Sequence, residues 1–176
     1  MHLKGNKCAR KPFVEGMRWT KRKYYFLSKQ RAKHIVRHVF FLLQFTAEID
    51  SIALAQAEPA VGDDVNMAGW GKTCDQFNCG VSDVVNQVTV PVLDDSVADE
   101  YYGTLDWDRI ICIDTTGGMG TCNGDSGGPL MVGDANGPLT GVTSFGSIFG
   151  CEVGAPACFT SIPNYLDWLN ENGNRK

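Results

Sequence analysis

Histidine is scarce in this chain of 176 residues, which contains only His2, His34 and His38. A reaction that needs an imidazole as general base therefore has no obvious base here, since all three lie within the first 38 residues. Cys74 and Cys79 are close in sequence, but no second cysteine pair or histidine has the spacing that a zinc site needs. The sequence predicts no metal and no cofactor.

Long apolar runs are also absent. Residues 39–45 are apolar but too short to cross a bilayer. They resemble the core of a signal peptide, yet Glu48 and Asp50 interrupt the stretch that follows, and the basic segment in front is too long. The sequence therefore predicts no membrane segment and holds no convincing signal peptide.

Basic residues become rare after residue 47. From Glu48 onward 19 acids face 4 bases, whereas residues 4–37 hold 12 Lys and Arg and a single acid. This change divides the chain into a basic leader, residues 1–47, and an acidic domain, residues 48–176. The leader mixes cations and aromatics around residues 21–26, which suits phosphates or an anionic membrane, but charge runs are usually just solvated.

For the leader we therefore expect an irregular structure and neither a nucleic-acid nor a membrane partner. Its abrupt end suggests translated non-coding sequence or a mis-joined exon rather than part of the fold.

The acidic domain has the pattern of an all-β fold. Short apolar runs are separated by turn residues, and these runs are residues 84–90, 109–113, 129–132 and 139–145. Residues 162–169 differ, because their apolar side chains have helical spacing after a proline. We expect one β domain with a helix at its C-terminal end.

Residues 121–130, TCNGDSGGPL, carry the strongest functional pattern. A serine hydroxyl is a weak nucleophile, so it must be held beside a base and near backbone N–H groups that stabilise the developing oxyanion. Gly124 allows the chain to turn so that its own N–H and that of Ser126 can face one small cavity. The loop predicts a serine hydrolase with Ser126 as nucleophile.

Together with other segments, this loop resembles the chymotrypsin-like serine proteases, and most of all their brachyurin or collagenase-like branch. The similar segments are residues 52–54, 68–72, 111–118, 141–146 and 163–169. The resemblance covers residues 48–176 and implies the second of two six-stranded antiparallel β-barrels, followed by an α-helix. The family's first barrel, with its Ala-Ala-His-Cys segment, and the Ile-Val-Gly-Gly start of the mature enzyme are not found.

The resemblance assigns catalytic roles within the acidic domain. Ser126 would form the acyl-enzyme, and the amides of Gly124 and Ser126 would bind the oxyanion. The family places the triad carboxylate directly before Ile-Ala-Leu, where serine stands here, so Asp50 is a candidate that is displaced by one residue. Asp125 is a structural residue that pairs in the family with a newly released N-terminal amine. Without that partner we expect an incompletely formed loop.

The resemblance also outlines a pocket for the substrate side chain. Its members are Gly120 at the base, Ser144, Phe145 and Gly146 on one wall, and Ala157 on the other. None of these residues is acidic, so the pocket suits Phe, Tyr, Leu or Met rather than Lys or Arg. Glu152, in the adjacent loop, is expected to be a solvated acid.

Seven cysteines favour an oxidising compartment, with one left over. The resemblance pairs Cys122 with Cys151 beside the pocket. It gives Cys112 a partner at the position of Ala98, which would leave the Cys112 thiol unpaired.

The remaining cysteines are assigned from their surroundings. Cys74 and Cys79 suit a local bridge across a four-residue gap. Cys158 lies in an apolar segment and is expected to be a small core residue. Cys8 belongs to the leader.

These observations predict a serine-type endopeptidase with apolar, chymotrypsin-like specificity. As written, the chain should hydrolyse peptides poorly or not at all, because no catalytic histidine can be identified. The alternative is a non-catalytic homologue that binds a peptide or protein without cleaving it. The expected partner is a peptide or protein substrate, with a protein inhibitor as a second candidate. Secretion is implied by the resemblance.

Overall fold

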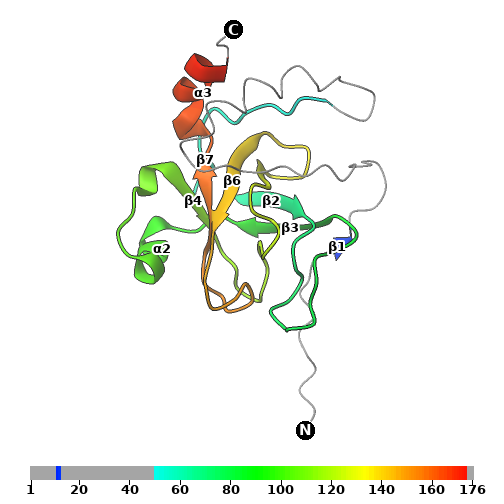
Figure 1. Cartoon of the computed structure of the whole chain (residues 1–176). Helices are drawn as coiled ribbons and strands as arrows, with labels where there is room; N and C mark the ends of the chain where they lie inside the picture. Colours follow the sequence, from blue (N-terminus) through cyan, green and yellow to red (C-terminus); the bar gives the residue numbers. More distant parts are fainter. Residues whose placement is uncertain (1–10, 13–49, 174–176) are drawn as a thin grey trace.

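The structure, a computed structural model, describes residues 11–12 and 50–173 (Figure 1). The strands are β1 Lys11–Pro12, β2 Asp64–Gly69, β3 Asn86–Pro91, β4 Ile110–Ile113, β5 Pro129–Val132, β6 Leu139–Phe145 and β7 Ala157–Ser161. The helices are α2 Asp95–Tyr102 and α3 Leu166–Gly173, with short 3-10 turns η1 Trp107–Arg109 and η2 Pro163–Tyr165. Apart from the two residues of β1, the leader and its expected irregular structure lie outside the described residues.

The strands form one antiparallel sheet that curls on itself. Their order is β1-β3-β2-β5-β6-β7-β4. The sheet closes beyond β3, where Val92 pairs with Ile113 and the Leu93 N–H donates to the Cys112 carbonyl over 2.9 Å. The predicted six-stranded antiparallel barrel with a C-terminal helix is thus confirmed, and β1 is a short addition at the β3 edge.

The core lies inside this curl, because alternate residues of each strand point inward. In β3, for example, Val88 and Val90 are buried while Thr89 between them is exposed. The largest fully buried side chains are Phe159, Ile113 and Leu130, from three different strands. The apolar interior holds the loops between strands in fixed positions at the rim.

Local sequence pattern predicts some elements better than others. The runs 129–132 and 139–145 coincide with β5 and β6, and the predicted helix appears as η2 followed by α3. The strands β2 and β7 and the helix α2 have no counterpart among the predicted runs. In β7 four of the five residues are buried, so the alternation that marks a half-exposed strand is missing.

Three disulfides connect the described cysteines, namely Cys74–Cys79, Cys112–Cys158 and Cys122–Cys151. The first and the last agree with expectation. The prediction that Cys112 is unpaired is wrong, whereas Cys158 is a buried core residue as expected and is the disulfide partner of Cys112. These two residues face each other in the β4–β7 ladder, and Ala98 of α2 packs against them in a small buried cluster.

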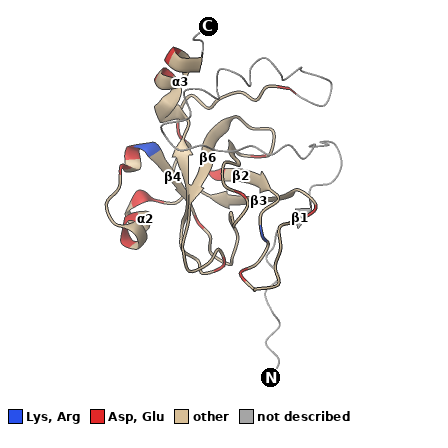
Figure 2. Ribbon diagram, viewed as in Figure 1, with Lys and Arg blue, Asp and Glu red and all other residues tan. Residues whose placement is uncertain are grey.

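Among the charged residues of the described chain, acidic residues far outnumber basic ones (Figure 2). Between residues 50 and 173 the only bases are Lys72 and Arg109. Arg109 pairs with Asp106 over 3.3 Å and lies over the ring of Tyr165. Within the described part of the chain, no helix is long and apolar enough to span a membrane.

Replacing Cys112 and Cys158 together by alanine should lower the free energy of unfolding by about 2–4 kcal/mol, because this bridge closes a long loop. Urea unfolding followed by tryptophan fluorescence measures the change. The matched variant Cys74→Ala/Cys79→Ala opens a bridge of sequence separation 5 rather than 46 and should cost less. Peptide mapping that finds a free Cys112 thiol would contradict the pairing.

Candidate active site

The loop between β4 and β5 presents Ser126 to solvent. Gly124 and Gly127 have φ of 104° and 79°, values that side chains rarely adopt, and they flank an exposed Ser126. The Gly127 N–H donates to the Thr143 carbonyl over 3.0 Å, which ties the loop to β6. The serine side chain is therefore displayed on a tightly turned and anchored backbone.

Two backbone donors beside this serine have no acceptor. Among the described residues, neither the N–H of Gly124 nor that of Ser126 donates a hydrogen bond, and the Ser126 hydroxyl has no hydrogen-bond partner. Such unpaired amides next to an exposed hydroxyl suit the stabilisation of a negative oxygen. This arrangement agrees with the roles predicted for Gly124 and Ser126.

The carboxylate of Asp125 points the opposite way, into the protein, and the residue is 6% exposed. Its Oδ1 accepts the Gly71 N–H over 2.7 Å and its Oδ2 accepts the Cys122 N–H over 2.9 Å. A cavity of about 10 Å³ adjoins it, lined in part by Gln87 and Thr143. Hydrogen bonds from backbone amides thus offset part of the free-energy cost of burying the charge. The expectation that the loop is incompletely formed stays a prediction.

Glycines at the end of β2 make room for this carboxylate. A Cβ on Gly69 would lie 2.1 Å from Asp125 Oδ1, and one on Gly71 would lie 2.4 Å from the carboxyl carbon. The Lys72 N–H also donates to the Asn123 carbonyl over 2.9 Å. The backbone after β2 and the nucleophile loop therefore fit together only with glycine at these positions.

Asp50, the candidate for the triad carboxylate, is exposed and is engaged locally. Its Oδ1 accepts the Ser51 N–H over 2.7 Å, and it makes no hydrogen bond with Ser126. Residues 50–173 also contain no histidine. The structure thus places the Ser126 hydroxyl close to the amides of Gly124 and Ser126, and the catalytic roles of these residues and of Asp50 stay predictions.

Two of the residues expected around the substrate side chain, Gly146 and Ala157, are neighbours where β6 and β7 pair. A Cβ on Gly146 would lie 4.0 Å from the Ala157 Cα and 4.0 Å from the Pro156 carbonyl oxygen. At the expected base, a Cβ on Gly120 would lie 3.0 Å from Thr115 Cγ2. Both positions are glycine and add no side chain here, and the one polar side chain among the five assigned residues, Ser144, is exposed. Their role in binding a substrate side chain stays a prediction.

Two residues that the sequence analysis did not single out, Tyr102 and Thr115, bind the backbone just before Ala157. The Tyr102 hydroxyl donates to the Pro156 carbonyl, and its ring packs edge-on against Phe145 with centroids 5.3 Å apart. The buried Thr115 hydroxyl donates to the Ala155 carbonyl over 2.7 Å. Burial, with a further contribution from Tyr101, raises the pKa of Tyr102, so its hydroxyl stays a donor at neutral pH. No local pattern reveals these roles, since each partner lies at least 40 residues away.

Glu152 is not the freely solvated acid that was expected. It is half-buried, and its Oε2 accepts the Asp75 N–H over 2.7 Å. Asp75, Cys122 and Cys151 lie close enough to hold a metal ion, but the two sulfurs are bonded to each other in the disulfide. Nothing in this cluster of described residues therefore indicates a metal centre.

Comparison with known proteins decides the family, because a family model described as Trypsin matches residues 29–169. The chain belongs to the trypsin family of serine proteases. It is 47% identical to brachyurin of Leptuca pugilator over 124 residues, covering 70% of this chain and 53% of the relative. It is 37% identical to trypsin-1 of Astacus astacus, covering 74% of this chain and 55% of the relative.

A solved structure agrees with this trypsin-family assignment. Neuropsin, a serine protease expressed in the limbic system of mouse brain, aligns with a TM-score of 0.64 and 29% identity, covering 73% of this chain and 56% of that one. The predicted resemblance to the family and to brachyurin is confirmed. This trypsin-family chain spans about half the length of the curated relatives it matches.

Gly71→Ala should destabilise the trypsin-family fold by about 1–3 kcal/mol, because the new methyl group would force the Asp125 carboxylate from its position. The Cys122 N–H donates to that carboxylate, so hydrogen exchange of this amide should become faster. Gly80→Ala is the matched control, since a Cβ there meets nothing within 4 Å. Equal unfolding free energies for the two variants would contradict the proposed fit.

Proposed function

We propose that residues 48–176 are the nucleophile-bearing and substrate-binding part of a serine endopeptidase. The observation that carries this proposal is the exposed Ser126 hydroxyl beside the amides of Gly124 and Ser126, which have no acceptor among the described residues, on a loop where the preceding side chain, Asp125, is buried. Membership of the trypsin family supports the same reaction. Peptide or protein substrates follow from that membership.

In the proposed reaction, the Ser126 Oγ attacks the carbonyl carbon of a peptide bond. The two amides stabilise the oxygen that becomes negative, and collapse of the intermediate releases the amine and leaves an acyl-enzyme that water hydrolyses. A histidine has to take the serine proton and return it to the leaving amine. No histidine lies between residues 50 and 173, so we expect this chain by itself to hydrolyse peptides poorly or not at all.

The proposed specificity is apolar. Gly146 and Ala157 lie next to each other, and none of the residues assigned to the base and walls of the pocket is acidic. A buried acid would be needed to hold Lys or Arg, so Phe, Tyr, Leu or Met is the proposed side chain on the acyl side of the cleaved bond.

We further propose that the protein acts outside the cell. The three disulfides of the described residues suit an oxidising compartment. A protein inhibitor that presents an apolar residue to the same pocket is a further candidate partner.

The alternative is a non-catalytic homologue that binds a peptide or protein. The missing histidine and the serine in place of the triad carboxylate favour it. The complete loop around Ser126 favours a protease, because a protein that has lost catalysis has no need for an exposed nucleophile between free amides. We therefore keep the endopeptidase as the leading proposal.

A chimera tests the reaction directly. Fusing the first barrel of brachyurin in front of residue 48 supplies a histidine, and fluorophosphonate labelling of Ser126 should then become about 10²–10⁴ times faster than in the present chain. Ser126→Ala should abolish the labelling, and Ser96→Ala, at an exposed serine outside the assigned site, should not. A folded chimera whose Ser126 reacts no faster than ordinary serines would favour the non-catalytic homologue.

A further inference from the structure

The backbone that follows β2 touches both loops of the candidate site. Near its start, Gly71 donates to the buried Asp125 carboxylate. A few residues later, Asp75 reaches the loop before β7, which carries Cys151 and Glu152. This connection is not expected from the sequence, since the two segments lie more than 70 residues apart.

Asp75 and Glu152 bind each other's backbone. The Asp75 carboxylate accepts the Cys151 N–H with Oδ1 and the Glu152 N–H with Oδ2, each over 2.8 Å. In return the Asp75 N–H donates to Glu152 Oε2 over 2.7 Å. A Cβ on Gly150 would lie 2.4 Å from Asp75 Oδ2, so this contact also requires a glycine. We call Asp75, Gly150, Cys151 and Glu152 the loop clamp.

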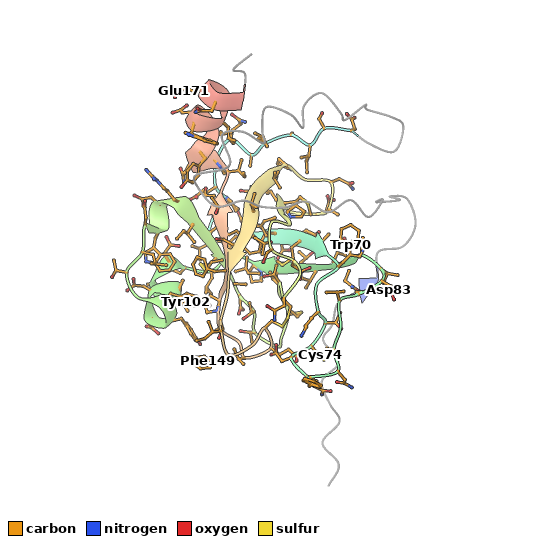
Figure 3. All side chains as sticks on the ribbon, viewed as in Figure 1. Trp70, Cys74, Asp83, Tyr102, Phe149 and Glu171 are labelled. Atoms are coloured by element: carbon orange, nitrogen blue, oxygen red, sulfur yellow. A yellow bond between two sulfur atoms is a disulfide. The ribbon has the colours of Figure 1, made fainter. Side chains whose placement is uncertain are left out.

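At its base, the loop that carries Asp75 is held by backbone bonds, since Lys72 pairs with Val81 and the Ser82 N–H donates to the Trp70 carbonyl. Phe77 at its tip is fully exposed, and Ile148 and Phe149 on the opposite loop are largely exposed, so these three apolar side chains do not pack the two loops together. Figure 3 shows Cys74 and Phe149 at the same end of the molecule. The Cys74–Cys79 disulfide closes the loop next to Asp75 and restricts where its carboxylate can lie.

The clamp is continuous with the proposed pocket. Cys151 is bonded to Cys122, four residues before Ser126, and the segment after Glu152 leads directly to Pro156 and Ala157 of the pocket wall. Movement of residues 150–152 would therefore move both the wall and the start of the nucleophile loop.

We propose that Asp75 is a positioning residue that holds the substrate pocket open in its binding geometry, with the Cys74–Cys79 disulfide holding Asp75 in place. The proposal rests on the proposed function, since it assumes that Gly146 and Ala157 bind the substrate side chain. Asp75 does not contact the substrate and acts only through residues 150–152.

The test uses the full chain and the peptide acetyl-Ala-Ala-Phe-amide, with acetyl-Ala-Ala-Lys-amide for comparison. Asp75→Ala should speed hydrogen exchange of the Cys151 and Glu152 amides and weaken binding of the Phe peptide about tenfold, the effect of roughly one net hydrogen bond. Cys74→Ser/Cys79→Ser should change both quantities in the same direction by less.

Asp134→Ala is the matched control, because Asp134 is an exposed acid whose carboxylate, among the described residues, accepts only the nearby Asn136 N–H. Glu152→Gln should bind the Phe peptide like the wild type, since an amide oxygen can still accept the Asp75 N–H. If Asp75→Ala binds the Phe peptide as tightly as the wild type, the positioning role is overturned and the proposed function stands. If the wild type binds neither peptide, the proposed pocket itself is overturned, and the positioning role with it.

Discussion

The buried carboxylate of Asp125 is the contact on which the geometry of the site depends. Two backbone amides, from Gly71 and Cys122, donate to its oxygens and help to offset the cost of burying the charge. Those bonds join the backbone after β2 to the start of the Ser126 loop. They also explain why the end of β2 carries glycine where almost any other residue would fit a strand.

From this anchor a chain of contacts reaches the proposed pocket wall. Cys122 is bonded to Cys151, and the loop of Cys151 is held by Asp75, which lies four residues beyond the Gly71 that binds Asp125. Three segments at one end of the apolar barrel are thus each bonded to the other two: the nucleophile loop, the backbone after β2 and the loop before β7. These mutual bonds hold the loops in place without a large apolar core between them. Catalysis depends on such fixed positions of the reacting groups.

The sequence predicts what depends on neighbouring residues and misses what depends on distant ones. The Ser126 loop and the strands at 129–132 and 139–145 could be predicted because turns, glycines and alternation are local features. The Cys112–Cys158 bridge could not, since it depends on the register between β4 and β7. Two hydrogen bonds could not be predicted for the same reason: the one from the Tyr102 hydroxyl to the Pro156 carbonyl, and the one from the Glu152 N–H to the Asp75 carboxylate. In each, the fold brings together residues that lie far apart in the sequence.

The measurement that tests this account most directly is the unfolding free energy of Asp125→Asn. The variant keeps the shape of the side chain but turns an NH2 group toward a backbone N–H donor, because both carboxylate oxygens accept amides. We predict a loss of about 1–3 kcal/mol and faster exchange of the Gly71 or Cys122 amide, with Asp134→Asn, at an exposed acid, unchanged. An Asp125→Asn protein within about 0.5 kcal/mol of the wild type would contradict the claim that this carboxylate organises the site.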